Sequence, residues 1–153
     1  MRATLRFAAV ATSVLVAGSL ASATAGTGST LGFAERIVRT HGYVPNASDW
    51  NPGSQFNVLT SVFARSADGY NQRAFFFYGR RYLGTDASEP SARVQAMWSD
   101  GTTVALTYVL YRRADPNCCP SGGGKIVRFR WTGRRVVALD PIPTRDWRAP
   151  LHR

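Results

Sequence analysis

The stretch that decides the fold is Ser-Ala-Arg-Val-Gln-Ala-Met-Trp-Ser-Asp-Gly-Thr-Thr-Val-Ala-Leu-Thr-Tyr-Val-Leu-Tyr-Arg, residues 91–112. Two runs rich in β-branched and aromatic residues, 91–98 and 103–112, flank the pair Asp100-Gly101. An Asp-Gly pair between two such runs is a strong signal for a tight antiparallel hairpin with a type I′ turn. The sequence therefore predicts two adjacent antiparallel strands here.

Similar runs separated by short turns extend on both sides of this hairpin, and short turns favour antiparallel neighbours. One helix candidate, Leu31–Thr40, precedes them and carries Leu31, Ala34, Ile37 and Val38 on one stripe. We therefore expect an α+β domain in which an antiparallel meander sheet of about six or seven strands carries one N-terminal helix packed on it. The aromatic run Phe75–Tyr78 is interpreted as the two faces of a central strand. The further strand candidates are 56–65, 73–78, 81–83, 125–131 and 135–139, whereas 44–54 reads as loop and 144–153 as an extended coil.

Alternation along the later strands divides their side chains between two faces. The face opposite the core would place Arg93, Tyr111, Arg128 and Arg130 on one sheet surface. Guanidinium groups bind carboxylates and phosphates through a planar fork, so this surface is a candidate anion-binding face. A solvated face kept soluble by charge is the alternative. The apolar face, expected to cover the helix and form the core, takes Val94, Ala96, Trp98, Val104, Leu106, Tyr108, Leu110, Val127, Phe129 and Trp131.

The first 25 residues have the pattern of an export signal. Arg2 and Arg6 precede an uncharged apolar stretch, 7–20, and small residues with two A-x-A sites follow it. This order is typical of a secretory signal peptide, with an uncleaved signal anchor as the alternative. The stretch is shorter than the roughly 20 apolar residues of a membrane-spanning helix, and no other segment fits one. The sequence therefore predicts a signal peptide over 1–25, a linker over 26–30, one domain over 31–143 and a C-terminal tail over 144–153, secreted into the extracellular space or the cell envelope.

The chain is strongly basic, with 19 Lys and Arg against 9 Asp and Glu and a formal net charge of +10. Such a charge favours anionic partners and opposes self-association. The expected partner is an anionic envelope polymer or another exported protein, because export disfavours nucleic acid. The arginines are scattered along the chain, so a solvated basic surface without a ligand is the alternative.

The two cysteines, Cys118 and Cys119, are adjacent in the run Asp-Pro-Asn-Cys-Cys-Pro-Ser-Gly-Gly-Gly, residues 115–124. In an oxidising compartment their first interpretation is a vicinal disulfide that fixes a turn. Neighbouring Cα atoms lie about 3.8 Å apart, closer than in ordinary disulfides, and almost no loop is closed. Such a bond would not act as a global staple. Reduced buried thiols, intermolecular bridges, a redox switch and metal binding are the alternatives.

The sequence contains no recognisable catalytic signature. It has no G-x-S-x-G, H-E-x-x-H, P-loop or dinucleotide fingerprint. His41 lies at the end of the helix candidate, where it is expected to stabilise the helix end, and Asp86 and Glu89 read as turn or cap residues. We therefore expect a non-enzymatic protein with no cofactor and no metal site.

Four segments of the chain resemble the LppP/LprE family of actinobacterial lipoproteins: AFFFYGRRYLGTD (74–86), YRRADPNCCPSGG (111–123), VRFRW (127–131) and LDPIP (139–143). The resemblance covers roughly residues 31–143. It implies a cell-envelope protein with no established catalytic activity, and Cys118 and Cys119 match the family's paired cysteines. These lipoproteins carry a lipid-attachment cysteine at the end of the signal, whereas this chain reads Leu-Ala-Ser-Ala-Thr-Ala-Gly there (20–26), which implies a freely secreted form.

The sequence thus predicts a small secreted cell-envelope protein with a binding function. The first expectation is a wall polymer bound to the arginine face. The alternative is a secreted inhibitor or partner of another exported protein, acting through the rigid 114–124 cysteine loop.

Overall fold

The computed structural model describes residues 27–153, so the predicted signal peptide over 1–25 lies outside the described residues. No helix in this part of the chain is long and apolar enough to cross a membrane. The elements run in the order α1 (Thr27–Thr40), β1 (Tyr43–Pro45), η1 (Ala47–Asp49), β2 (Phe56–Phe63), β3 (Gln72–Tyr78), β4 (Arg81–Thr85), β5 (Val94–Ser99), β6 (Thr103–Val109), β7 (Tyr111–Arg112), β8 (Gly124–Trp131), β9 (Val136–Ala138) and β10 (Leu151–His152).

Helix α1 begins at Thr27 rather than at Leu31, so most of the predicted linker over 26–30 is helical. The predicted apolar stripe is confirmed, because Ala34 and Val38 are fully buried and Leu31 packs beside them. The helix ends at Thr40, and the expected stop signal, Gly42, follows it with a positive φ of 81° and an N–H that donates to the Arg39 carbonyl. The stripe therefore determines which face of α1 turns toward the strands.

The prediction of a single meander sheet is wrong, although the antiparallel hairpins within it are confirmed. The strands form two four-stranded antiparallel sheets: the helix-side sheet, in the order β1-β2-β3-β4, and the outer sheet, in the order β5-β6-β8-β9. A separate two-stranded pair joins β10 to β7. The connection 86–93 carries the chain from one sheet to the other.

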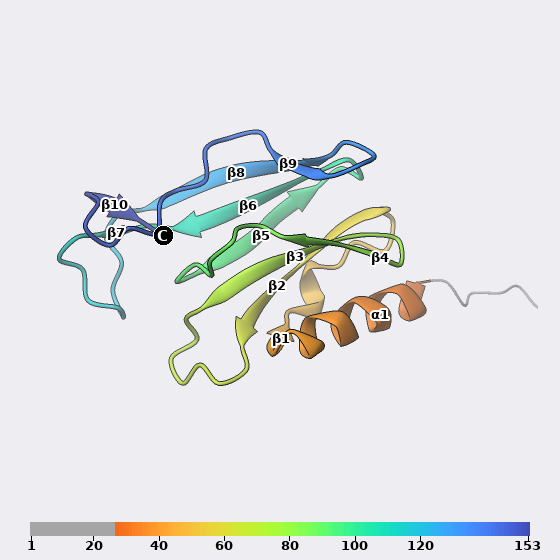
Figure 1. The fold of residues 1–153 in the computed structure, drawn as a ribbon, viewed down its shortest axis with the longest axis horizontal. Helices are drawn as coiled ribbons and strands as arrows, with labels where there is room; N and C mark the ends of the chain where they lie inside the picture. The colour runs from red at the N-terminus through yellow and green to blue at the C-terminus, as the bar shows by residue number, and fades with distance from the viewer. Residues whose placement is uncertain (1–26) are drawn as a thin grey trace, which may run out of the picture.

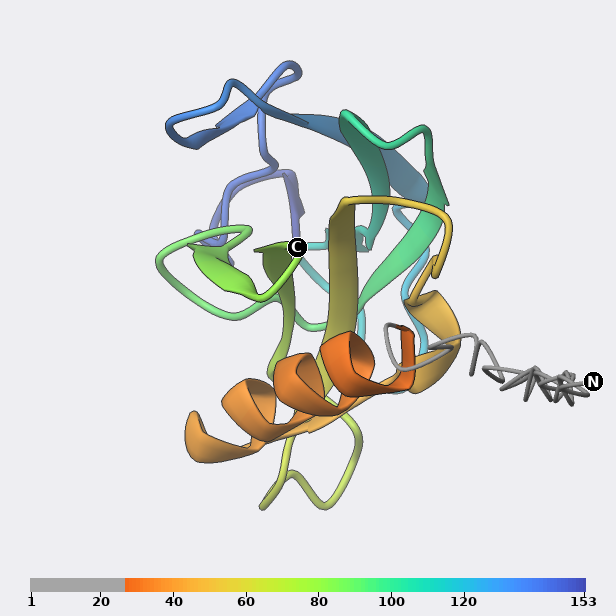
Figure 2. The same cartoon turned by 90° about the vertical axis from the view of Figure 1, so that its right-hand side faces the viewer.

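The reason for two sheets is that β3 must be covered on both faces. Phe75 and Phe77 belong to the core cluster under α1, whereas Phe76 belongs to the cluster on the opposite face, and all three are buried. A single sheet with one helix would leave Phe76 in water. The second sheet supplies the missing cover, which gives three layers in the order α1, helix-side sheet, outer sheet (Figures 1 and 2).

The predicted core face of the later strands is buried, but it packs on the helix-side sheet rather than on the helix. Val104 lies opposite Phe129, and Leu106 opposite Val127, on the face that meets Phe76. Trp98 departs from the prediction because a β-bulge after Ala96 shifts the register. The bulge places Trp98 opposite Ala105, where 48% of the residue is exposed.

Two segments expected to be irregular contain regular structure. The predicted loop 44–54 includes most of β1 and the 3₁₀ turn η1. The tail 144–153, expected to be an extended coil, folds back so that β10 pairs with β7. Arg153 is buried there, and its backbone N–H donates to the Thr144 carbonyl. The tail is therefore part of the packed domain.

The two-sided burial of β3 predicts that Phe76→Ala lowers the free energy of unfolding by about 3–5 kcal/mol, because it opens a cavity between the sheets. Met97→Ala, at a residue that is 54% exposed, is the matched control and is expected to change it by less than about 0.5 kcal/mol. Urea denaturation followed by circular dichroism measures both. Equal losses in the two variants would contradict the layered core.

Candidate functional site

Four segments meet at one end of the sandwich, which we call the loop end (Figure 1). They are the β2–β3 loop (64–71), the connection 86–93, the cysteine loop (113–123) and the C-terminal segment 144–153. They enclose a cavity of about 490 Å³, the loop-end cleft, whose lining includes Asp68, Tyr70, Glu89, Asn117, Trp147 and His152.

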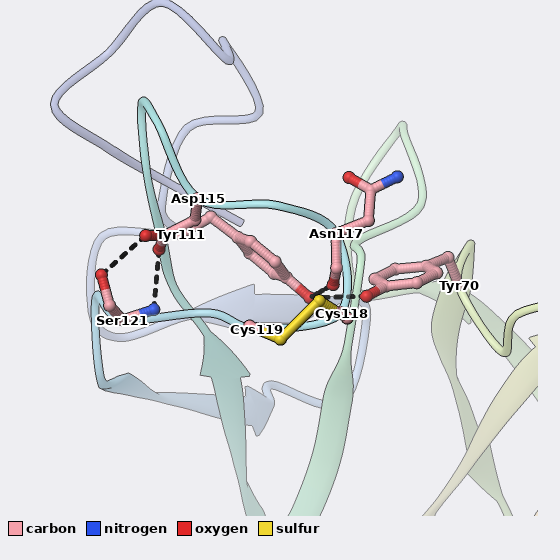
Figure 3. Close-up of a disulfide and its surroundings, with 7 residues drawn as sticks. All are labelled: Tyr70, Tyr111, Asp115, Asn117, Cys118, Cys119 and Ser121. Carbon is pink, nitrogen blue, oxygen red and sulfur yellow. Dashed lines mark hydrogen bonds between the residues drawn. A yellow bond between two sulfur atoms is a disulfide. The ribbon is translucent and has the colours of Figure 1, made fainter.

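The cysteine loop carries a disulfide between Cys118 and Cys119, as predicted (Figure 3). Their Cα atoms lie 3.8 Å apart and both residues are exposed. The described part of the chain has no free cysteine. The disulfide therefore occupies the surface of the loop, where it is open to solvent.

Asp115 closes the cysteine loop from inside. Its carboxylate accepts hydrogen bonds from the Arg112 N–H, the Ser121 N–H and the Ser121 hydroxyl, each at 2.7 Å. These backbone donors lower the pKa of Asp115 below its ordinary value, so the carboxylate stays ionised. At Gly122 a Cβ atom would stand 2.7 Å from the Leu110 carbonyl oxygen, so only glycine fits this close approach.

Tyr111 joins the cysteine loop to the β2–β3 loop. Its hydroxyl lies 3.1 Å from the Asn117 carbonyl and 3.3 Å from the Tyr70 hydroxyl (Figure 3). The side chain is buried, and desolvation together with the Tyr70 contact raises the pKa of Tyr111 to about 12. The ring of His152 stacks on it with centroids 5.9 Å apart. Tyr111 thus serves as a structural anchor of the loop end.

A buried polar group, which the sequence did not reveal, supports the loop end from beneath. The Asp86 carboxylate accepts hydrogen bonds from the Ala74 N–H at 2.9 Å and from the Tyr108 hydroxyl at 2.8 Å. Burial raises the pKa of Asp86 despite these bonds. The Arg153 guanidinium lies 5.9 Å from the Tyr108 ring and donates to the Ser91 hydroxyl at 2.6 Å. The group connects both sheets with the C-terminal segment.

The four residues predicted to form one anion-binding face lie in two separate places in the structure. Arg93 and Tyr111 lie at the loop end, where the Arg93 guanidinium stacks over Tyr70 at 5.4 Å. Arg128 and Arg130 lie on β8, and Arg128 is held by Asp140 through two hydrogen bonds of 2.9 Å. This bidentate pair leaves Arg130 as the exposed arginine of that strand without a salt bridge in the described structure.

The opposite end of the sandwich, the turn end, gathers exposed positive charge. The β3–β4, β5–β6 and β8–β9 turns lie together there (Figure 1). Within residues 27–153, no carboxylate lies within salt-bridge distance of the arginines at this end. The Arg81 guanidinium lies 5.6 Å from the Trp131 ring, and that of Arg80 lies 5.4 Å from the Phe33 ring. We call this exposed set the turn-end patch; it consists of Arg80, Arg81, Arg130, Arg134 and Arg135.

Comparison with known proteins gives one family. A family model described as LppP/LprE lipoprotein matches residues 48–134, more than half of the chain. The match runs from η1 to the β8–β9 turn and includes the cysteine loop. No curated protein and no solved structure matches the chain.

The raised pKa of Asp86 predicts that the free energy of unfolding depends on pH, because ionising the buried Asp86 carboxyl destabilises the folded protein. Because the pKa is raised in the folded state, the wild type loses stability as the pH rises from the ordinary aspartate value through the raised one. An Asp86→Asn variant keeps an acceptor for Ala74 and does not ionise. Its free energy of unfolding, relative to that of the wild type, is expected to increase as the pH rises above the ordinary aspartate pKa of about 4.

Urea denaturation at each pH measures this difference. The control is Asp146→Asn, at an exposed position. If the difference in free energy of unfolding between Asp86→Asn and wild type stays constant over the pH range, then ionisation of Asp86 does not destabilise the folded protein.

Proposed function

Because the chain belongs to the LppP/LprE lipoprotein family, whose members are associated with the cell envelope, we propose that it is a non-enzymatic binding protein that holds an anionic envelope polymer at the turn-end patch. The observation that carries this proposal is the set of five exposed arginines at that end, none of which forms a salt bridge within residues 27–153. Asp100, in the β5–β6 turn, acts on Arg130 only at longer range. An anionic chain would meet several guanidinium forks at once, each able to bind a carboxylate or phosphate.

Aromatic contacts prepare part of this patch for a ligand. Arg81 lies over Trp131, and the Trp131 and Tyr78 rings lie 5.9 Å apart at their centroids. Stacking restricts the guanidinium without satisfying its N–H donors, so less conformational entropy is lost on binding. Arg128 is less suitable because Asp140 already occupies its fork.

The proposal of a non-enzymatic role is supported by how the reactive groups are used. Cys118 and Cys119 are bonded to each other, and the Asp86 carboxylate is engaged by Ala74 and Tyr108 in the core. These two cysteines and this buried carboxylate therefore have structural partners.

The first prediction concerns the patch. In an Arg81→Ser, Arg134→Ser and Arg135→Ser variant, affinity for a soluble polyanion such as heparin and for purified cell-wall fragments is expected to fall roughly tenfold or more. Wild-type binding is expected to weaken between about 0.1 M and about 1 M salt, as the Debye length shortens from about 10 Å to about 3 Å.

The matched control removes three exposed arginines elsewhere, by Arg36→Ser, Arg39→Ser and Arg65→Ser. It loses the same charge and is expected to bind nearly as wild type. Equal loss in both triple variants would indicate a general charge effect and would overturn the assignment to the turn end.

We also propose that the mature protein is released without a lipid. The expected species in the culture medium has the mass of residues 26–153, less two hydrogens, and takes up thiol label only after reduction. Intact mass spectrometry with and without reduction measures this. Retention in the membrane fraction with the signal intact, or two labelled thiols before reduction, would contradict it.

A second candidate function is contact with another exported protein through the cysteine loop. The favouring observation is that Asp115, Tyr111 and the disulfide hold an exposed loop in one shape. A partner bound in this way should be lost when Cys118 and Cys119 are replaced by serine, and kept by the turn-end variant. A partner retained by the serine variant would exclude the loop.

A further inference from the structure

We propose that the loop-end cleft binds a neutral saccharide. This site goes beyond the proposed function, because it lies at the other end of the sandwich from the turn-end patch and selects a different chemistry (Figure 1). Its volume, about 490 Å³, falls in the range of small-molecule binding sites.

The cleft lining carries charges of both signs, two carboxylates and two guanidinium groups, so no single charge dominates it. Asp68 and Glu89 contribute carboxylates and Arg145 contributes a guanidinium. Hydrogen bonds from the Ser66 hydroxyl and the Tyr70 N–H lower the pKa of Asp68, so it remains negative. Arg153 also lines the cleft, but its Nε and Nη1 donors are directed to the carbonyls of Pro143 and Glu89 and to the Ser91 hydroxyl. A phosphate or carboxylate would therefore meet repulsion as well as attraction.

The same side chains suit a ligand rich in hydroxyl groups. A sugar hydroxyl both donates and accepts, so neighbouring hydroxyls can bridge carboxylate, amide and guanidinium groups at once. The cleft offers all three types in Glu89, Asn117 and Arg145. Planar groups of this kind pair with two adjacent hydroxyls in a bidentate manner.

An exposed aromatic ring borders the cleft. Trp147 is 62% exposed, the highest exposure among the large apolar side chains of the described residues. An indole face is apolar and carries negative potential, which suits the C–H face of a sugar ring. The Arg148 guanidinium lies over one face of the Trp147 ring, 5.3 Å from its centroid. A sugar would stack on the rest of this exposed indole surface, beside the polar groups of the cleft.

Two residues of the cleft lining, Asn117 and His152, are anchored by the surrounding structure. Asn117 is held through its carbonyl by Tyr111, and His152 is held by stacking on Tyr111 and by the β10–β7 pair. Because these groups are already ordered, binding costs little conformational entropy. The vicinal disulfide follows Asn117 directly in the chain.

The test is titration of the purified protein with maltotriose, cellotriose and chitotriose, three neutral oligosaccharides, by isothermal calorimetry. At least one is expected to bind, and Trp147→Ala is expected to weaken it about tenfold, within the range of ring-stacking contributions. Trp98→Ala is the matched control, because Trp98 is also exposed but lies away from the cleft lining. Glu89→Gln and Asn117→Ala provide independent variants on the polar wall and are expected to weaken binding.

Binding that persists at about 1 M salt and in the Arg81→Ser, Arg134→Ser and Arg135→Ser variant would support this site even if the polyanion proposal fails. No binding of any neutral oligosaccharide would overturn the inference. So would equal affinities of Trp147→Ala, Trp98→Ala and wild type, or binding restricted to anionic sugars and abolished by salt.

Discussion

The structure depends on the need to bury both faces of β3. Phe75 and Phe77 require a cover on one side and Phe76 on the other, and burial of each such ring contributes roughly 1.5–3 kcal/mol. Helix α1 can meet only the first requirement. The outer sheet exists to meet the second, and the connection 86–93 is the place where the chain changes layer. The three-layer arrangement follows from this one strand.

The sandwich keeps its two ends chemically separate. At the turn end, short connections present exposed arginines beside aromatic rings, and the polar contacts there stay within single turns, as where Asp100 accepts from the Thr102 and Thr103 N–H groups. At the loop end, longer segments are tied together by Asp115, Tyr111 and the buried Asp86 group. The first end is suited to long-range attraction of a polymer, and the second to a shaped contact. A protein that works at an envelope surface can use both.

Local patterns predicted the parts of this fold that depend on local chemistry. The antiparallel hairpin around Asp100-Gly101, the stripe on α1 and the interpretation of 75–78 as two faces of a strand are confirmed, as is the cysteine pairing. The predicted type I′ turn is wrong, because it needs a positive φ at both Asp100 and Gly101, and Asn71 is the one non-glycine residue of the described chain with a positive φ. The division into two sheets was missed because a period of two residues identifies the buried face but not what covers it. The bulge that exposes Trp98 was also missed, since no residue type marks it.

The candidate site was less predictable, because its residues are joined only by tertiary structure. Asp86 and Arg153 belong to one buried polar group although they lie far apart in the sequence. The residues around each of them carry no pattern that predicts this contact. The alternation pattern predicted Arg93 and Arg128 on the same face of one sheet. In the structure, Arg93 stacks over Tyr70 at the loop end, whereas Arg128 pairs with Asp140 on β8. An aromatic partner of Arg93 and a charged partner of Arg128, both from distant segments, thus hold the two arginines in different places.

The phenylalanine run that supports both cores also leaves the register of β3 poorly specified by its apolar pattern. A slip of one residue would exchange the faces of Phe75, Phe76 and Phe77 yet keep every position apolar, so hydrophobic burial alone does not fix the register. Polar side chains beside the run must do so. Arg73 donates to the Ala87 and Ser88 carbonyls, and on β2 the buried Asn57 binds the backbone of Asn51 and Ser54. The alignment of the central strands is thus specified by a few buried polar groups, and their loss would favour misaligned pairing over simple weakening of the core.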